Sequence, residues 1–169
     1  MKDILNTSFE SLASDLQGDL FFDSMMRKIY ATDASSYREI PQAVAYPKSV
    51  EDIKVLIKFA RENHTSLIPR AAGTSLAGQV VGAGIVVDVS KYMTEILEVD
   101  ENEKWVRTQP GVIRDVLNMH LKPYGLLFGP ETSTASRAMI GGMIGNNSCG
   151  SNSLVFGSTR SLVGDQGNS

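Results

Sequence analysis

The sequence predicts a fold of mixed helices and strands organised as two subdomains. Between residues 43 and 89, short apolar segments of strand length alternate with one segment of helical periodicity. Between residues 95 and 128, a hairpin pattern precedes a second helical segment. A chain of 169 residues is within the usual size of one domain, about 100 to 200 residues. We therefore expect two subdomains rather than a repeat, because the two blocks share no residue period.

An amphipathic helix is predicted at the start of the chain. Its apolar residues recur every three or four positions, at Phe9, Leu12, Leu16 and Leu20. Ser8 is a candidate N-cap for this helix. The polar segment from Tyr30 to Arg38 lacks periodicity and is typical of a loop. Residues 1–39 are therefore predicted to be an N-terminal helical extension followed by an entry loop.

The first subdomain is predicted to span residues 40–94. Its first strand, residues 43–46, ends at Pro47. Ser49 is placed to cap a helix that runs to about Asn63, and its expected apolar face consists of Val50, Ile53, Ile57 and Ala60. Residues 66–69 and 85–89 are predicted strands rich in β-branched side chains. Because a helix separates them, the strands at Ala43 and Leu67 should be parallel.

The second subdomain is predicted to span residues 95–169. Alternating residues at 95–99 and 104–108 flank a turn sequence, which indicates a β-hairpin. A helix follows, with apolar or packing positions at Ile113, Val116, Leu117, His120 and Leu121. Pro123 and Gly125 should end that helix. Residues 126–128 are predicted to form a further strand.

Composition excludes several classes of protein. A formal charge of −3 and a pI near 5.4 provide no basic surface for nucleic acid. Cys149 is the single cysteine, so an internal disulfide and a cysteine-based metal site are excluded, and a small buried apolar role is expected for it. The apolar runs are much shorter than the roughly 20 residues of a transmembrane helix. We expect a cytoplasmic protein, with peripheral attachment to a membrane as the alternative.

The first glycine-rich loop, Arg70–Gln79, follows a predicted strand. Its glycines and hydroxyl residues could direct several backbone N–H groups toward one phosphate. It is not a P-loop, because Gln79 and Val80 replace the required Lys and Ser/Thr. Gly82 and Gly84 likewise fail the Rossmann pattern, because they precede a strand rather than a helix. An ordinary turn remains the alternative for this loop, and a surface side chain the alternative for Arg70.

The second glycine-rich loop begins at Gly129. Five of the chain's 15 glycines lie between residues 141 and 157. Its apolar residues indicate a short buried turn or helix, at Met139, Ile140, Met143 and Ile144. Gly141 and Gly142 would let a flat ring approach the main chain. A packing corner of small residues is the alternative.

Several segments, in order, resemble one known family. They are PRAAGTSLAGQ, GIVVDVSKYM, ILEVD, QPGV, GLLFGPETSTASRAMIGGMIGNNSCG and FGSTRSLV. From about Ile40 to Val163 the chain resembles the FAD-binding domain of the vanillyl-alcohol oxidase/p-cresol methylhydroxylase superfamily, and within it the D-lactate dehydrogenase and glycolate oxidase subunit group. The opening YATDASSYREIPQAVAYPKS resembles members that carry an iron–sulfur region.

The resemblance implies an α+β, two-subdomain FAD-binding fold of the p-cresol methylhydroxylase type, with FAD between the subdomains. The first loop would bind the pyrophosphate through Arg70, Ala72, Gly73, Thr74, Ser75, Gly78 and Gln79. The second would follow the ribityl chain and isoalloxazine through Pro130, Glu131, Thr132, Ile140, Gly141, Gly142, Asn146, Asn147 and Gly150. Some relatives attach the flavin to a histidine in the first loop, where this chain has Ala71 and Ala72. Non-covalent FAD is therefore expected.

The resemblance also implies a redox activity to which this chain contributes no catalytic residue and no metal ligand. The family's flavin domain continues beyond the position of Val163 and is followed by a substrate domain, so we expect a fold incomplete at its C-terminus and a chain inactive in isolation. The parent enzyme would oxidise a D-2-hydroxy acid such as lactate or glycolate, and an iron–sulfur region or another electron acceptor would be its redox partner. The alternative is a nucleotide-binding or assembly module without redox activity.

Overall fold

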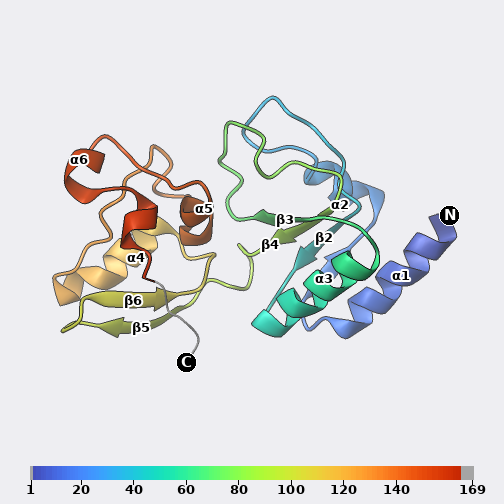
Figure 1. The fold of residues 1–169 in the computed structure, drawn as a ribbon, viewed down its shortest axis with the longest axis horizontal. Helices are drawn as coiled ribbons and strands as arrows, with labels where there is room; N and C mark the ends of the chain where they lie inside the picture. The colour runs from blue at the N-terminus through green and yellow to red at the C-terminus, as the bar shows by residue number, and fades with distance from the viewer. Residues whose placement is uncertain (1, 165–169) are drawn as a thin grey trace. The chain divides into compact units, whose positions relative to one another are not determined.

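A computed structural model describes residues 2–164, which form two compact units with their boundary between Met93 and Thr94 (Figure 1). Each unit combines helices and strands, so the expected α+β fold is confirmed. Met1 and residues 165–169 lie outside the described part, including the end of the predicted second subdomain. Within the described part, no helix is both long enough and apolar enough to cross a membrane.

The first unit is built on a four-stranded sheet of order β1-β2-β4-β3. Its strands are β1 (Asp19–Phe21), β2 (Ala43–Tyr46), β3 (Leu67–Arg70) and β4 (Ile85–Asp88). Strands β2 and β3 each pair in parallel with β4, whereas β1 pairs antiparallel with β2. The predicted parallel relation of β2 and β3 is therefore confirmed, although β4 lies between them. All four residues of β4 are buried, as expected for a central parallel strand with a continuous apolar sequence.

Two helices, α1 (Lys2–Asp15) and α3 (Val50–Glu62), pack against this sheet. The prediction of Ser8 as N-cap was wrong, since α1 begins at Lys2. Phe9 and Leu12 are buried as predicted, but Leu20 reaches the same core from β1 and not from the helix. The core cluster consists of Phe9, Leu12, Ala43, Ala45, Leu56, Ile85 and Val87.

The ends of α3 agree with the prediction, but its buried face agrees only at Ala60. The Ser49 hydroxyl accepts a hydrogen bond from the Asp52 N–H at 3.2 Å, and Asn63 is the C-cap. The predicted face included Val50 and Ile57, which are 55% and 54% exposed. The helix buries Ala60 as predicted, together with Asp52 and Leu56, which were not on the predicted face.

Asp52 explains the rotation of α3. Its carboxylate accepts backbone N–H groups from Gln17 at 2.8 Å, Gly18 at 3.1 Å and Lys48 at 2.8 Å. A buried carboxylate is tolerated when such donors surround it. The helix therefore turns this acid inward, and Asp52 connects the start of α3 to the segment between α1 and β1.

Strand β1 and helix α2 (Ser24–Ile29) were not predicted. Both are too short for a periodic pattern, and β1 exists because β2 offers it an edge. A local signal was present at Asp23, whose carboxylate accepts the N–H groups of Met25 and Met26 and caps α2.

The second unit contains the predicted hairpin and helix. Strands β5 (Ile96–Asp100) and β6 (Trp105–Thr108) pair antiparallel. Helix α4 (Arg114–Leu121) leads into the 3-10 turn η1 (Lys122–Tyr124), and Gly125 ends it with φ 66°. The predicted strand at 126–128 was wrong. The Asn118 side chain bonds both the N–H and the C=O of Phe128, at 2.8 and 3.1 Å, and so occupies the groups that a strand partner would need.

The chain after Gly129 folds into short helices connected by turns. These are α5 (Ile140–Gly145), α6 (Ser153–Phe156) and the 3-10 turn η2 (Thr159–Leu162). Ile140 and Met143 are buried as predicted, whereas Ile144 is 39% exposed. The second core cluster consists of Val112, Leu117, Leu121, Ala138, Ile140 and Met143.

Candidate functional site

The first glycine-rich loop leaves the carboxyl end of β3, an edge where ligands bind in parallel sheets. The backbone turns at Gly73 and Gly78, with φ of 65° and 70°. Between them, the Ser75 hydroxyl accepts the Ala77 N–H at 3.2 Å and donates to Gln79 Oε1 at 2.6 Å. The structure thus brings the predicted residues from Gly73 to Gln79 into one compact turn.

Arg70 is held by side chains and backbone from the entry loop. Its Nη1 donates to the carbonyl of Thr32 at 2.8 Å, and its guanidinium carbon lies 5.0 Å from the centre of the Tyr30 ring. A side chain added at Gly73 would come within 2.8 Å of Arg70 Nη2. The guanidinium therefore lies directly against the backbone of the loop that it precedes.

A partly buried polar network, which the sequence did not reveal, contacts Arg70 through the Tyr30 ring. The Tyr30 hydroxyl bonds Asp88 Oδ2 and the Tyr46 hydroxyl, both at 2.6 Å. Asp88, only 4% exposed, also accepts the Ser90 N–H at 2.7 Å. Burial, followed by the hydrogen bond to Asp88, raises the pKa of Tyr30 well above its ordinary value. The one available signal was an acid at the end of the apolar segment IVVD.

In the second loop, Glu131 and Gly150 are in close contact. A side chain on Gly150 would overlap the carbonyl oxygen of Glu131. The Glu131 carboxylate accepts a hydrogen bond from the Asn152 side chain at 2.7 Å, and Pro130 is buried nearby in sequence. Gly150 therefore permits two distant parts of the loop to touch.

Gly141 is required for packing in this structure. Its N–H donates to the Pro110 carbonyl at 2.8 Å, and an added Cβ would lie 2.6 Å from Pro110 Cβ. Ile140 N–H donates to Val112 at 2.9 Å. By contrast, Gly142 is exposed, so its main chain is accessible to a ligand.

The two predicted asparagines stabilise the turn after α5. Asn147 adopts φ 48°, and its Oδ1 accepts the Arg160 N–H at 3.0 Å. Asn146 Nδ2 donates to the Ser148 hydroxyl at 3.3 Å. The expected buried role of Cys149 was wrong, because this thiol is exposed. The turn holds its shape by polar contacts and leaves the cysteine at the surface.

A buried hydroxyl in the second loop suits a ligand. Thr132 Oγ1 is buried and has no hydrogen-bond partner among the described residues. Such a group costs about 1 to 3 kcal/mol unless a partner is supplied. FAD, with its many donors and acceptors, could supply one. The residues present therefore fit the group that the sequence predicted.

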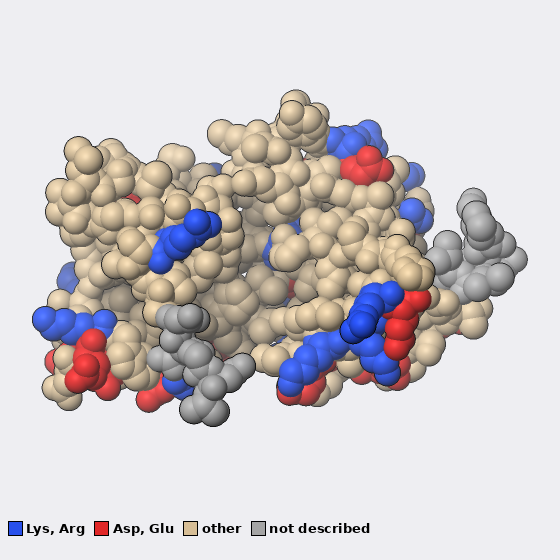
Figure 2. All heavy atoms as spheres, in the orientation of Figure 1, with Lys and Arg blue, Asp and Glu red and all other residues tan. Residues whose placement is uncertain are grey.

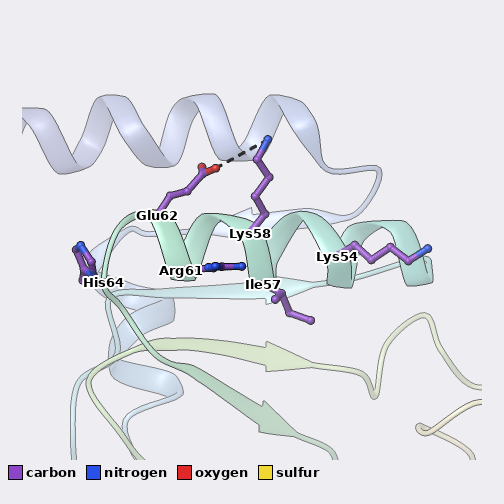
Figure 3. Close-up of a pocket in the computed structure, with 6 residues that line it drawn as sticks. All are labelled: Lys54, Ile57, Lys58, Arg61, Glu62 and His64. Atoms are coloured by element: carbon purple, nitrogen blue, oxygen red, sulfur yellow. Dashed lines mark ion pairs between the residues drawn. The ribbon is translucent and has the colours of Figure 1, made fainter.

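A depression on the outer face of α3 is of a different kind. Its walls are Lys54, Ile57, Lys58, Arg61, Glu62 and His64 (Figure 3). Lys58 pairs with Glu62 at 4.0 Å and Lys54 with Glu51 at 3.4 Å, both on exposed side chains. Figure 2 shows basic and acidic side chains interspersed in this part of the surface. This is a solvated helix face, and it contains none of the predicted cofactor residues.

Within residues 2–164, no cluster of three or more His, Cys, Asp or Glu is placed to bind a metal.

Comparisons with known families and proteins match the part of the chain that contains both glycine-rich loops. Residues 41–165 match the family model described as FAD binding domain. D-2-hydroxyglutarate dehydrogenase of Haemophilus influenzae is 44% identical over 150 residues, which are 87% of this chain and 15% of that protein. The Escherichia coli enzyme of the same name is 42% identical over 95% of this chain and 16% of its own length. Glycolate oxidase subunit GlcD of Bacillus subtilis is 34% identical over 81% of this chain and 30% of that protein.

Solved structures show the same fold. Alkyldihydroxyacetonephosphate synthase superposes with a TM-score of 0.80 at 20% identity, over 90% of this chain and 31% of that one. p-Cresol methylhydroxylase superposes with a TM-score of 0.75 at 14% identity, over 88% of this chain and 30% of that one. The expected resemblance to the p-cresol methylhydroxylase-type fold is confirmed. This chain spans about one sixth of the two dehydrogenases named above.

Proposed function

The chain belongs to the family of FAD-binding domains, and from this premise we propose that it holds FAD for an enzyme that oxidises a D-2-hydroxy acid to the 2-oxo acid. The observation that carries the proposal is the family match over residues 41–165, which includes both glycine-rich loops. The flavin oxidoreductases to which the chain is related are named for D-2-hydroxyglutarate, D-lactate and glycolate. Those names support the substrate class.

We propose that the first loop binds the FAD pyrophosphate. It turns at two glycines of positive φ directly after a strand end, and backbone N–H groups in such turns can form a concave site for an anion. The first unit contributes Arg70, Ala72, Gly73, Thr74, Ser75, Gly78 and Gln79. Since Ala71 and Ala72 offer no nucleophile, the FAD is held without a covalent bond.

The second loop is assigned to the ribityl chain and the isoalloxazine. The unpartnered Thr132 hydroxyl and the exposed Gly142 backbone support this assignment. The second unit contributes Pro130, Glu131, Thr132, Ile140, Gly141, Gly142, Asn146, Asn147 and Gly150. Bound FAD would supply the two-electron chemistry by accepting a hydride at the flavin, and these residues bind and orient it.

Titration of the purified chain with FAD tests the cofactor. We expect saturable one-to-one binding with a perturbed visible spectrum, and release of all flavin on acid precipitation. A chain that binds no flavin at saturating FAD would favour the rival function, an assembly module without redox activity. Flavin that stays with the acid precipitate would contradict non-covalent binding.

The substrate class is tested in the enzyme that carries this chain. D-2-hydroxyglutarate, D-lactate and glycolate, each added without oxygen, should be compared with the L enantiomers where these exist. Bleaching of flavin absorbance by at least one of the former three, and not by the L acids, is expected. Bleaching by none of them would contradict the proposed substrate class and leave the FAD assignment intact.

A further inference from the structure

The entry loop crosses the first glycine-rich loop and contacts it at both of its turns. Ala34 N–H donates to the Gly73 carbonyl at 3.2 Å. At the other turn, a Cβ on Gly78 would lie 2.7 Å from Tyr37 Cδ2, so the Tyr37 ring rests on this glycine. Both segments lie beyond the same edge of the first unit's sheet (Figure 1). The entry loop therefore touches the two residues at which the glycine loop reverses direction.

From these contacts we propose that Thr32–Tyr37 is a third segment of the FAD site, which holds the Arg70–Gln79 loop in its pyrophosphate-binding conformation, with Tyr37 as a positioning residue at Gly78. The inference rests on the proposed function of that loop. The entry loop lies outside the family match, which begins at residue 41. It thus adds residues that the motifs themselves do not include.

Positive φ at Gly73 and Gly78 makes this support necessary. Glycine populates many backbone conformations with similar energy, so a loop built on two such residues pays a large entropy cost when it binds a ligand. Contacts that fix both glycines reduce this cost before FAD arrives, and such preorganisation increases affinity. The contact at Gly73 is a hydrogen bond, and the contact at Gly78 is a ring packed against the main chain.

Arg70 belongs to the same support. Its guanidinium donates to Thr32, stacks on Tyr30 and packs against Gly73. Tyr30 is in turn bonded to the buried Asp88 at the end of β4. This chain of contacts connects the entry loop to the sheet core. We therefore assign to Arg70 a positioning role through its planar guanidinium, in addition to any attraction of its charge for phosphate.

Tyr37 allows positioning to be separated from folding. The residue is 62% exposed and is absent from both core clusters. Its removal should therefore change loop order far more than global stability. The contact at Gly78 uses the ring, so phenylalanine can replace tyrosine there.

The test compares Tyr37→Ala with Tyr37→Phe in the 169-residue chain. We expect Tyr37→Ala to weaken FAD binding about tenfold, to accelerate amide exchange of residues 73–79 without FAD, and to leave the thermal unfolding midpoint unchanged. Tyr37→Phe should keep both the FAD affinity and the amide exchange rate of wild type. Tyr124→Ala removes a tyrosine ring from the second unit, where it packs on His120. This control should leave FAD affinity and the exchange of residues 73–79 as in wild type.

Arg70→Lys is the second variant, because lysine keeps the charge but loses the planar fork of donors. We expect it to weaken FAD binding and to accelerate exchange of residues 73–79, as Tyr37→Ala does. Wild-type FAD affinity in Tyr37→Ala, or weakened FAD affinity in Tyr37→Phe, would overturn this inference and leave the proposed function intact. Wild-type behaviour of Arg70→Lys would overturn the role of the guanidinium. A wild-type chain that binds no FAD would overturn the proposed function, and this inference with it.

Discussion

The two glycine-rich loops use glycine for different physical reasons. In the first loop, Gly73 and Gly78 adopt positive φ, a conformation that other residues enter only with strain. In the second, Gly141 and Gly150 have no positive φ and instead lie against Pro110 and Glu131. Gly73 and Gly78 thus need freedom of the backbone, whereas Gly141 and Gly150 need the absence of a side chain; Gly157, farther along the second loop, has φ 73°.

The loops also differ in where their support originates. The second loop contains α5, α6 and η2, and its contacts come from within the second unit: Asn147 accepts the Arg160 N–H inside the loop, and Ile140 and Gly141 donate to the carbonyls of Val112 and Pro110. The first loop has no helix of its own and depends on residues 32–37. Changes in the second loop, which supplies Ala138, Ile140 and Met143 to the core of its unit, should therefore reduce stability first. Changes in the first loop should reduce FAD binding first.

The largest effect is expected for Gly150→Ala. The new methyl group would overlap the Glu131 carbonyl, and such overpacking costs about 1 to 3 kcal/mol. Urea unfolding should show this loss, together with loss of FAD binding. Gly145→Ala is the control, because nothing lies within 4 Å of its added Cβ. If Gly150→Ala proved as stable as this control, the claim that Gly150 serves close packing would be wrong.

Gly73→Ala should follow in size. An L residue at φ 65° costs about 1 to 2 kcal/mol, and the new Cβ would displace Arg70. Gly125→Ala carries nearly the same φ of 66° with open space around it, so it should lose similar stability. Only Gly73→Ala should weaken FAD binding. Equal FAD affinity in the two variants would contradict the assignment of the first loop to the FAD site.

Two threonine-to-valine changes give a smaller effect and a sharper contrast. Thr159 is fully buried, and its hydroxyl donates to the Ser148 carbonyl at 2.7 Å, so Thr159→Val should cost about 1 kcal/mol. Thr132→Val removes a buried hydroxyl without a described partner, so the unfolding free energy should stay level or rise. FAD affinity should nevertheless fall in Thr132→Val. Destabilisation by Thr132→Val with normal FAD affinity would contradict its assignment to the ligand.

The smallest effect concerns the Tyr30 network under the first loop, and it is confined to alkaline pH. Burial and the hydrogen bond to Asp88 raise the pKa of Tyr30 in the folded state. The folded protein therefore binds the Tyr30 proton more tightly than the unfolded chain does. This contribution to the free energy of unfolding is complete below the unfolded pKa of about 10, and it is lost as the pH rises above that value. The free energy of unfolding, measured with urea between about pH 9 and 11, should fall more steeply with pH for wild type than for Tyr30→Phe. An equally steep fall in both proteins would argue against the hydrogen bond between Tyr30 and Asp88.

Sequence patterns predicted the elements whose side chains repeat along the chain. Strand β2, the ends of α3, the β5–β6 hairpin and α4 follow from periodicity and capping, and the structure has them. The face of α3 could not be predicted in this way, because Asp52 is buried by backbone donors from Gln17 and Gly18, which are distant in sequence. A pattern within one element carries no information on such partners.

The candidate site shows the same division. Motifs identified the two loops, but nothing in the polar segment from Tyr30 to Arg38 revealed its contacts with Arg70, Gly73 and Gly78. The entry loop makes these contacts through the Thr32 carbonyl, the Ala34 N–H and the exposed Tyr37 ring. Such interactions depend on tertiary position and not on residue type. Asp88 is the exception, because an acid that ends a buried strand needs a partner.

Amide hydrogen exchange of the chain with and without FAD tests the central claim most directly. The account predicts that FAD slows exchange in both loops, at residues 71–79 and 130–150, and in the entry loop at 32–37, while peptides from α3 remain unchanged. Protection confined to α3, or absent from both loops when FAD is bound, would contradict it.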